Sequence, residues 1–553
     1  MYLHGRQITP AHATEIFGNL IVVIKNSRNY PSSVPNSSIK KRYAAKLLTN
    51  LTGAALGFVT MSFVPRAIGA ADFGRFEFIT VNLNLLITTL GLSVPVAFFN
   101  WVSKEDGVRR DAAIAVTALM SLGVIGVLAI LIAGAQLAGI SGGLWPDIGP
   151  GVLWLGFLFA VFFFFIQNLG YLGDGIALSV GLETRRMVYN VARAGILTVL
   201  FFTGFLNLAA YFWVQISLLA GLSIWLWVWM RPQQRFSREW LAEPATKAAI
   251  RDFLRFAWGY SRPLVLYGVV GLIYGYADRW VLQISGGSEQ QAFYGLAYRF
   301  GSITFMFTSA MTAVLMREFT VSHAKNDLPR LQSLFNRIRM FVGMAAVLGA
   351  FLAVNAGAVT TIFAGPGFEA AALPVAIMAF YPIHQTFGQL SNSLILAAGK
   401  TRFYSRVGIA SMIISIPISY LLLAGGNGSK IAWLPAGLGL GATGLAIKMV
   451  GLQLIACNIF LFYNTRQLRV AYRPWVWFQI LAVGLPLICA WVVQKVVLGF
   501  GLPLIPSLII QGVVYMVLMM LLVSFRSELI GITRDEMRAE LSKIRNRFRV
   551  RFL

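Results

Sequence analysis

Long apolar segments, separated by short polar stretches, make up most of the chain. A helix that crosses the hydrocarbon core of a bilayer needs about 20 mostly apolar residues, and about fourteen segments meet this requirement. They lie at about 44–65, 77–101, 112–139, 150–172, 187–206, 209–230, 259–284, 291–316, 338–364, 370–398, 404–425, 434–463, 476–498 and 502–524. The pattern therefore predicts an all-α membrane protein with about fourteen transmembrane helices.

The longest basic stretch between these segments, RPQQRFSREWLAEPATKAAIRDFLRF, separates the sixth segment from the seventh. Its apolar positions Ile250, Phe253, Leu254 and Phe256 predict a helix at the membrane surface. This stretch divides the first twelve segments into two sets of six. We expect a cytoplasmic extension at 1–43, an N-lobe at 44–230, a basic interfacial linker at 231–258, a C-lobe at 259–463, two further helices at 464–524 and a basic amphipathic cytoplasmic tail at 525–553.

The composition agrees with a membrane protein, because 57% of the residues are hydrophobic, only 12% are charged and the mean hydropathy is +0.71. Soluble domains carry about 25% charged residues. The net charge of +25 would also suit a nucleic-acid-binding protein. The basic residues, however, gather between apolar segments and at the chain ends, as in Lys40-Lys41-Arg42 and Arg185-Arg186. This pattern predicts that both termini are cytoplasmic and that the basic loops and tail contact anionic lipid.

The ends of the first and seventh segments are similar to each other. VPRAIGAADFGRFEF and ADRWVLQISGGSEQQAFYGLAYRF each place an arginine at the outer end, then a glycine-containing turn, then an aromatic residue followed by glycine. Phe73-Gly74 corresponds to Tyr294-Gly295. Internal repeats are common in transporters, so we expect two pseudo-symmetric lobes related by an axis normal to the membrane. Chance similarity is the alternative.

The stretch NLTGAALGFVTMSFVPRAIGAADFGRFEFIT resembles the opening of the polysaccharide-biosynthesis, Wzx-type flippases of the MOP superfamily. That superfamily also contains the MATE multidrug exporters and the lipid II flippases. The residues that carry the resemblance are Arg66, Ile68-Gly69, Asp72, Phe73 and Gly74 in the first half, and Pro263, Asp278-Arg279 and Tyr294-Gly295 in the second half. The resemblance covers residues 44–524, with the same arrangement of six, six and two segments.

The resemblance implies a two-lobed transporter with a central cavity in the bacterial inner (cytoplasmic) membrane. It implies export of an undecaprenyl-diphosphate-linked oligosaccharide from the inner to the outer leaflet by alternating access, for O-antigen or exopolysaccharide synthesis. The expected partners are this polyprenyl-diphosphate-linked glycan and the glycosyltransferases and polymerase of the same pathway.

Basic residues inside the apolar segments are the candidate ligands of the diphosphate headgroup. Arg299 lies eight residues into the eighth segment, and Lys448 lies near the centre of the twelfth. No water reaches them from the lipid, so they should face protein or an aqueous cavity. Arginine binds phosphate oxygens bidentately and stays charged. We therefore expect Arg299 and Lys448, with Arg193 as a third residue, to bind the headgroup. The alternative is a buried structural ion pair, such as Asp278 with Arg299.

Asp278 is nearly the only acid inside a long apolar segment, and ionisable residues within a membrane usually mark a functional site. It is expected either to couple transport to a proton or sodium ion or to act as a static counter-ion. Arg66 and Arg279 occupy similar places in the two halves. They are expected to close an outer gate across the cleft, or to lie at the level of the lipid headgroups.

His384 lies in the tenth segment beside Gln385, Gln389 and Asn392. These side chains are candidates for hydrogen bonds to sugar hydroxyls, and His384 also for titration. The alternative is a histidine satisfied by a neighbouring residue. The sequence has no phosphate-binding glycine-rich loop, no HExxH and no paired acids in a loop. We therefore expect a transporter that has no cofactor and is not an enzyme.

Three other functions compete with the flippase. A MATE-like cation-coupled exporter is disfavoured by the basic candidate cavity and because Glu77 and Asp174 lie near segment ends. A lipid II-type flippase would use the same chemistry on a different sugar. A non-transporting scaffold of a polysaccharide synthase would use the basic tail and linker to dock a glycosyltransferase.

Overall fold

The computed structural model describes residues 2–3, 6–7, 39–92, 94–230, 240, 243–425 and 436–525. Most of the expected N-terminal extension, the first part of the linker and the expected tail at 526–553 lie outside the described residues. Strands β1 (Tyr2–Leu3) and β2 (Arg6–Gln7) form a small antiparallel pair. The other elements of the described residues are helices, as the hydrophobic pattern predicts.

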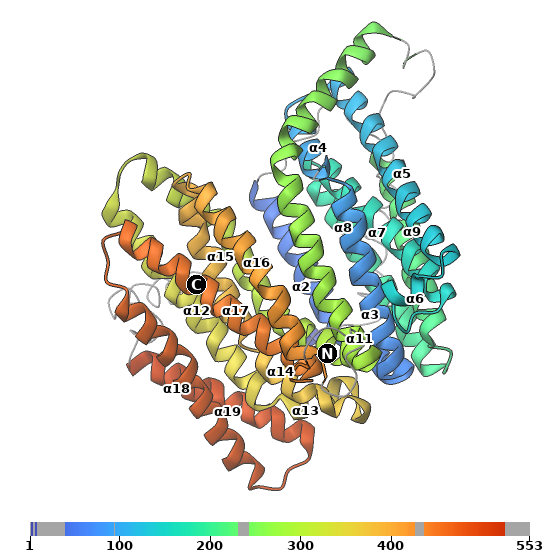
Figure 1. Cartoon of the computed structure of the whole chain (residues 1–553). Coiled ribbons are helices and arrows are strands. Elements are labelled where there is room, and N and C mark those ends of the chain that lie inside the picture. The colour runs from blue at the N-terminus through green and yellow to red at the C-terminus, as the bar shows by residue number, and fades with distance from the viewer. Residues whose placement is uncertain are drawn as a thin grey trace.

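The N-lobe is a bundle of helices that lies on one side of the molecule (Figure 1). Its helices are α2 (Ile39–Met61), α3 (Val64–Leu90), α4 (Val94–Val102), α5 (Gly107–Leu137), α6 (Ser141–Leu144), α7 (Pro150–Gly175), α8 (Ser179–Phe202) and α9 (Leu208–Met230). Phenylalanines of α3 and α7, among them Phe76 and Phe159, pack in its core.

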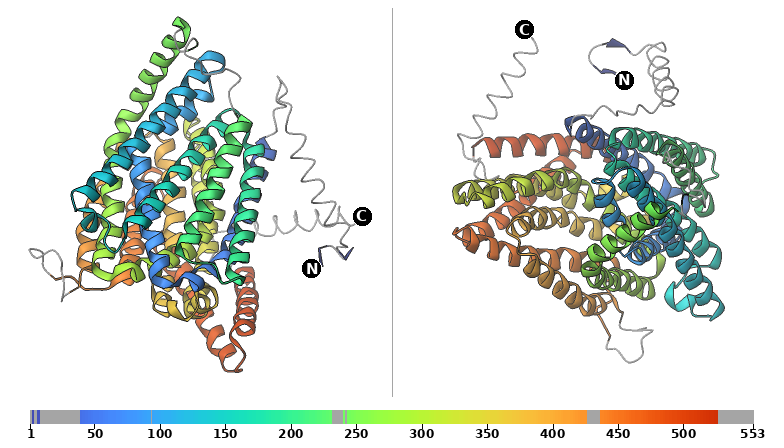
Figure 2. Two further views of the ribbon diagram at one scale, coloured as in Figure 1. Left: turned by 90° about the vertical axis from the view of Figure 1, so that its right-hand side faces the viewer. Right: turned by 90° about the horizontal axis from the view of Figure 1, so that it is seen from above.

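The C-lobe begins with one long helix, α11, which runs from Pro244 to Ala324. The elements after it are α12 (Leu328–Val354), α13 (Ala356–Ala364), the 3-10 helix η2 (Pro366–Ala371), α14 (Ala372–Met378), α15 (Tyr381–Ala397), α16 (Thr401–Leu423), α17 (Gly441–Gln467), α18 (Arg473–Leu498) and α19 (Leu504–Phe525). The two lobes converge at the lower end of Figure 1 and diverge above it. Helices α18 and α19 lie at the edge of the C-lobe (Figure 2).

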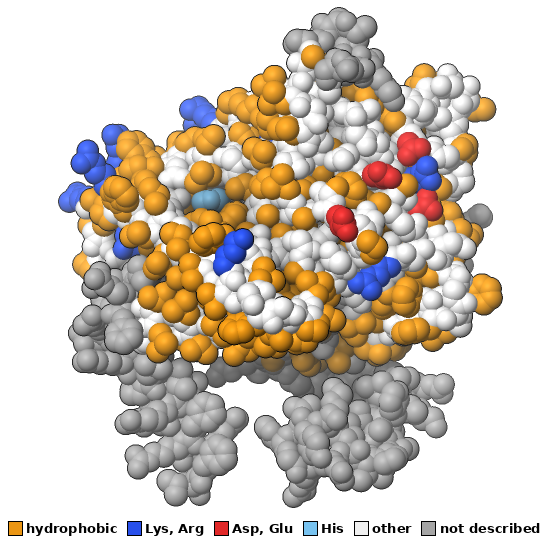
Figure 3. Space-filling view, turned by 90° about the horizontal axis from the view of Figure 1, so that it is seen from below, with side chains coloured by type: hydrophobic (Ala, Val, Ile, Leu, Met, Phe, Trp, Pro, Cys, Tyr) orange, Lys and Arg blue, Asp and Glu red, His pale blue; other side chains and the backbone are white. Residues whose placement is uncertain are grey.

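Nine helices of the described residues are long and apolar enough to cross a membrane, or ten if the bent pair of α2 and α3 is one span. The expected count of fourteen is therefore not confirmed. Helices α8 and α11 are not among the nine. Seen from below, apolar side chains lie among uncharged polar ones on the described surface, with a small number of charged side chains between them (Figure 3).

Helices α3 and α11 share an unusual bend. Gly69 interrupts α3 with φ 80° and ψ 167°, and Gly287 interrupts α11 with φ 73° and ψ −172°. This backbone conformation is essentially restricted to glycine. Both glycines fall in the two sequences that resemble each other at the ends of the first and seventh segments. The common bend supports the internal repeat predicted from the sequence.

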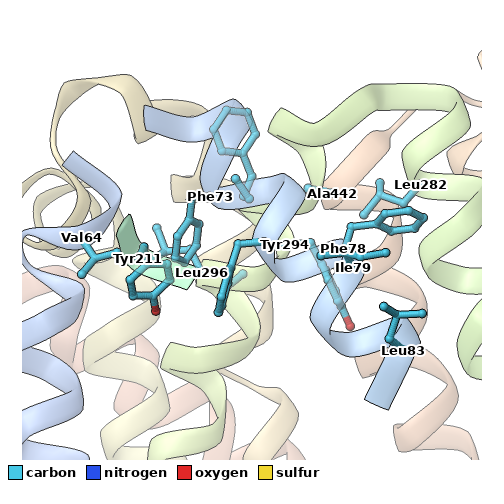
Figure 4. Close-up of a cluster of buried hydrophobic side chains, with 14 of the residues drawn as sticks. Val64, Phe73, Phe78, Ile79, Leu83, Tyr211, Leu282, Tyr294, Leu296 and Ala442 are labelled. Carbon is cyan, nitrogen blue, oxygen red and sulfur yellow. The ribbon is translucent and has the colours of Figure 1, made fainter. Parts of the chain in front are cut away.

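Beyond these bends, α3 and the second part of α11 cross at very short distance. A Cβ atom added to Gly74 would overlap the backbone carbonyl of Ser288, and one added to Gly295 would lie 2.9 Å from Cγ of Glu77. Large side chains surround this crossing, including Phe73 and Tyr294 (Figure 4). The two glycines that correspond in the repeat are therefore the residues that let the lobes touch.

Helix α6 and the loop after it hold the N-lobe against α11 at the converging end. Three side chains on one face of α11 donate hydrogen bonds to backbone carbonyls of this segment. They are Tyr276 to Leu144 (2.6 Å), Trp280 to Gly143 (2.8 Å) and Gln283 to Pro146 (3.0 Å). Ser288 adds a bond from its hydroxyl to the carboxylate of Asp147 (2.6 Å). We call this set of four hydrogen bonds the clasp.

The described part of the expected linker, residues 243–258, forms the first turns of α11. Phe253 is fully buried and packs on Phe98 and Trp101 of α4, with ring centroids 6.5 and 5.7 Å apart. Asp252 forms an ion pair with Arg109 (3.1 Å). This segment therefore packs on the N-lobe and continues without a break into the expected seventh span.

Replacing Gly74 by valine should destabilise the protein by about 1 to 3 kcal/mol or more, because an overpacked side chain there meets backbone rather than a movable side chain. Thermal unfolding in detergent measures the effect. The matched control is Gly126→Val on α5, where an added Cβ meets no atom within 4 Å. Equal shifts of the unfolding midpoint in the two variants would argue against the tight crossing.

Candidate functional site

Two neighbouring cavities, which share lining residues of the N-lobe, are lined by arginines. The first, of about 390 Å³, lies at the lobe crossing and is lined by Glu77, Arg193 and Arg299 among other residues. The second, of about 580 Å³, shares Arg193 with the first and extends to Glu183 and Arg186. Three arginines therefore lie along one hollow in the N-lobe.

Arg299 forms an ion pair with Glu77 between the two lobes. Glu77 is buried on α3, three residues after Gly74, and the guanidinium of Arg299 lies 5.4 Å from the ring centroid of Phe73. The alternative considered for Arg299, an ion pair inside the protein, is present, but its partner is Glu77 and not Asp278. Sequence reasoning assigned Glu77 to the end of a segment and gave it no role, although its position beside the glycine of the repeat placed it at the crossing.

Arg193 has no carboxylate partner among the described residues. Its guanidinium lies 5.7 Å from the ring centroid of Tyr189. The Tyr189 hydroxyl donates to Gln215 (3.5 Å), and Gln215 donates to the hydroxyl of Tyr211 (3.2 Å), which also interacts with Arg299. Arg193 thus presents an uncompensated positive charge to the hollow, in a polar network that leads to the lobe crossing.

The other end of the hollow carries paired charges. Arg186 forms an ion pair with Glu183 (3.3 Å), and nearby Lys46 forms one with Asp174 (2.7 Å). Arg186 and Arg193 are seven residues apart on α8, which places them on one face of the helix about 10 Å apart. An anion that entered here would meet a paired arginine first and the unpaired Arg193 next.

Asp278 and Lys448 form an ion pair that is buried inside the C-lobe. Ser419 donates a hydrogen bond to the same carboxylate (2.5 Å), and the ammonium lies 4.5 Å from the ring centroid of Tyr274. Neither Asp278 nor Lys448 lines the cavities described here. Lys448 is therefore separated from Arg193 and Arg299, with which the sequence grouped it.

The C-lobe contains a cavity of about 470 Å³ between α11, α15, α16 and α17. Gln385, Gln389 and Asn392 line it, but His384 does not. His384 is buried, and its Nδ1 has no hydrogen-bond partner among the described residues. The three amides therefore share one helix face toward the cavity, and the histidine lies on another.

The two arginines expected at an outer gate differ in their contacts. Arg66 donates to the backbone carbonyls of Thr361 (2.9 Å) and Ile362 at the end of α13, which belongs to the C-lobe. Arg279 donates to Gln291 (3.1 Å) of its own helix and lies over the ring of Tyr294. Only Arg66 of this pair bridges the lobes. Next to Arg279, Trp280 makes the bridging contact in the clasp instead.

Comparisons with known proteins agree with this architecture. Residues 39–316 match a family model described as polysaccharide biosynthesis protein. No curated protein matches the chain. The lipid II flippase MurJ in an inward closed conformation is similar in structure, with a TM-score of 0.60, 12% identity and coverage of 87% of this chain and 98% of that chain.

An inward-facing multidrug resistance MATE family transporter of the MOP superfamily is also similar. Its TM-score is 0.53 at 16% identity, over 81% of this chain and 98% of that chain. At such identities these two structures establish the fold alone. Because the family match spans half of the sequence, the chain belongs to the polysaccharide biosynthesis protein family, and it has the fold of MOP-superfamily transporters.

Proposed function

We propose that this protein flips an undecaprenyl-diphosphate-linked oligosaccharide from the inner to the outer leaflet of the bacterial cytoplasmic membrane. The observation that carries the proposal is the hollow of the N-lobe, in which Arg193 has no carboxylate partner among the described residues and Arg299 lies at the lobe crossing. A lipid diphosphate needs such a cationic, water-accessible site inside the membrane.

The two arginines have complementary roles in this proposal. Arg193 binds a phosphate oxygen without first losing a partner. Arg299 keeps its ion pair with Glu77, because Glu77 is buried and costly to leave unpaired. The remaining guanidinium N–H groups of Arg299 bind the second phosphate. Arg186 meets the headgroup at the inner end of the hollow.

Alternating access accounts for the closed end of the molecule. The clasp and the bonds of Arg66 hold the lobes together there. If the basic loops are cytoplasmic, this closed end faces outward and the diverging end faces the cytoplasm. Export then requires these bonds to break while the lobes close at the other end.

A cation-coupled exporter is the second candidate, and one observation favours it. Glu77 places a carboxylate inside the N-lobe cavity, although the sequence predicts that Glu77 lies near the end of a membrane-spanning segment. Arg299 already neutralises this carboxylate, however, and Arg193 leaves the cavity positively charged. A cationic substrate would therefore be repelled. Uptake of a cationic dye by proteoliposomes tests this candidate directly.

Asp278 and Lys448 serve in this proposal as a structural pair in the C-lobe. Their charges compensate each other, and the Ser419 hydroxyl satisfies the carboxylate further. The lysine would have to leave Asp278 unpaired in order to bind a headgroup, which is costly at a buried position. The lipid-linked glycan remains the proposed substrate, with glycosyltransferases and a polymerase of the same pathway as proposed partners.

The Arg193→Ala variant should reduce transport of lipid-linked glycan in proteoliposomes by about 10- to 150-fold, the equivalent of one hydrogen-bonded charged contact of about 1.5 to 3 kcal/mol. The assay measures glycan that becomes accessible at the far leaflet. Arg337→Ala, which removes an exposed arginine of α12, is the control and should transport normally. Wild-type rates for Arg193→Ala would contradict the assigned headgroup site, and a wild-type protein without any transport would favour the scaffold.

Asp278→Leu should destabilise the protein by about 3 to 5 kcal/mol, because it leaves the ammonium of Lys448 buried without a partner. The double variant Asp278→Leu/Lys448→Met should recover most of this loss in thermal unfolding and should retain transport. A double variant that is as stable as the wild type but does not transport would show instead that the pair takes part in coupling.

A further inference from the structure

The cavity of the C-lobe differs in chemistry from the hollow of the N-lobe. Its volume of about 470 Å³ falls within the range of small-molecule sites, about 300 to 1,000 Å³. None of its described lining residues is charged. Its polar lining residues are four tyrosines, four amides and two serines, Ser411 and Ser415. The amides are Gln385, Gln389, Asn392 and Gln453.

Three buried side-chain oxygens in this wall have no hydrogen-bond partner among the described residues, and one of them is the hydroxyl of Ser415. The other two are the amide oxygens of Gln389 and Asn392. Gln453 lies opposite, on α17, with its amide nitrogen 3.0 Å from where a Cβ of Gly388 would stand. Glycine at 388 thus leaves room for this amide between α15 and α17. Buried acceptors without donors cost free energy. A ligand with several hydroxyl groups would satisfy the amides of Gln389 and Asn392 when their side chains turn toward the cavity that the two residues line.

A line of aromatic rings lies between this cavity and Arg299. Tyr381, in its wall, lies 6.2 Å from Tyr298 between ring centroids, and Tyr298 lies 6.3 Å from Tyr294. Tyr298 precedes Arg299 on α11 and is 40% exposed. A molecule that contacts both sites would therefore pass these rings, of which Tyr298 is the exposed one.

We propose that the C-lobe cavity is the glycan subsite, in which uncharged sugar residues stack on the tyrosines and donate hydroxyl hydrogen bonds to Gln389 and Asn392. This inference rests on the proposed function, and it assigns the two parts of the substrate to different lobes. The diphosphate lies with Arg193 and Arg299, and the glycan extends past Tyr298 and Tyr381 into the C-lobe.

The chemistry of the lining excludes other occupants of comparable size. A phosphate would find no cation among the described lining residues, since the ammonium of Lys448 lies behind Tyr274 and is held by Asp278. A cationic drug would find no carboxylate there. An acyl chain would leave the amides unpaired. A neutral polyol satisfies the amides and the tyrosine hydroxyls together.

The two subsites are distinguished by comparing the affinities of the protein for a lipid diphosphate with and without the glycan. The probes are undecaprenyl diphosphate and the undecaprenyl-diphosphate-linked glycan extracted from cells that lack this protein, each titrated against the purified full chain in nanodiscs. The Gln389→Leu/Asn392→Leu variant should bind the glycan-linked lipid about tenfold more weakly or worse. It should bind undecaprenyl diphosphate with unchanged affinity. Arg193→Ala should weaken binding of both lipids.

Two controls keep the result interpretable. Ser393→Ala alters a buried residue of the same helix that does not line the cavity, and it should bind both lipids normally. Gln389→Asn, which keeps an amide, should lose less affinity for the glycan-linked lipid than the leucine variant. If the leucine variant kept its affinity for both lipids, or lost affinity equally for both, the glycan subsite would be overturned. The proposed function would not be affected by that result. A wild-type protein that binds neither lipid would overturn the proposed function and this inference with it.

Discussion

The close crossing of α3 and α11 is the contact on which the rest of the structure depends. Glycine at 74 and 295 brings the two helices together, and the bends at Gly69 and Gly287 direct the chain into the crossing. The ion pair of Glu77 with Arg299 forms beside it. The contact that joins the lobes and the contact that would recognise a phosphate therefore share one arginine.

The two lobes have similar helical frameworks but differ in whether charged side chains line their cavities. In the N-lobe, arginines line the hollow and one of them lacks a carboxylate partner among the described residues. In the C-lobe, the buried charges of Asp278 and Lys448 compensate each other away from the cavity, which tyrosines and amides line. This division suits a substrate with an anionic diphosphate at one end and a neutral glycan at the other.

The sequence predicted the helical class, the lobes and the repeat, because apolar length and glycine spacing are local properties. It singled out Arg193 and Arg299 because a basic residue deep in an apolar segment must face protein or water, and both line a cavity; their role in binding a headgroup stays a prediction. It could not predict that Lys448 pairs with Asp278 while Arg299 pairs with Glu77, because the rotation of each helix in the packed bundle decides which side chains meet. Likewise, His384 and Gln385 are adjacent in sequence but lie on different faces of α15.

The central claim is that the end closed by the clasp and Arg66 opens during transport. Spin labels at Gly142 and Gly367, where added side chains meet no atom within 4 Å, report the separation of the two lobes at that end in a chain whose two native cysteines are replaced. In proteoliposomes, addition of the lipid-linked glycan should add a population with a longer distance between the labels. A single, unchanged distance under conditions in which the glycan is transported would contradict the account.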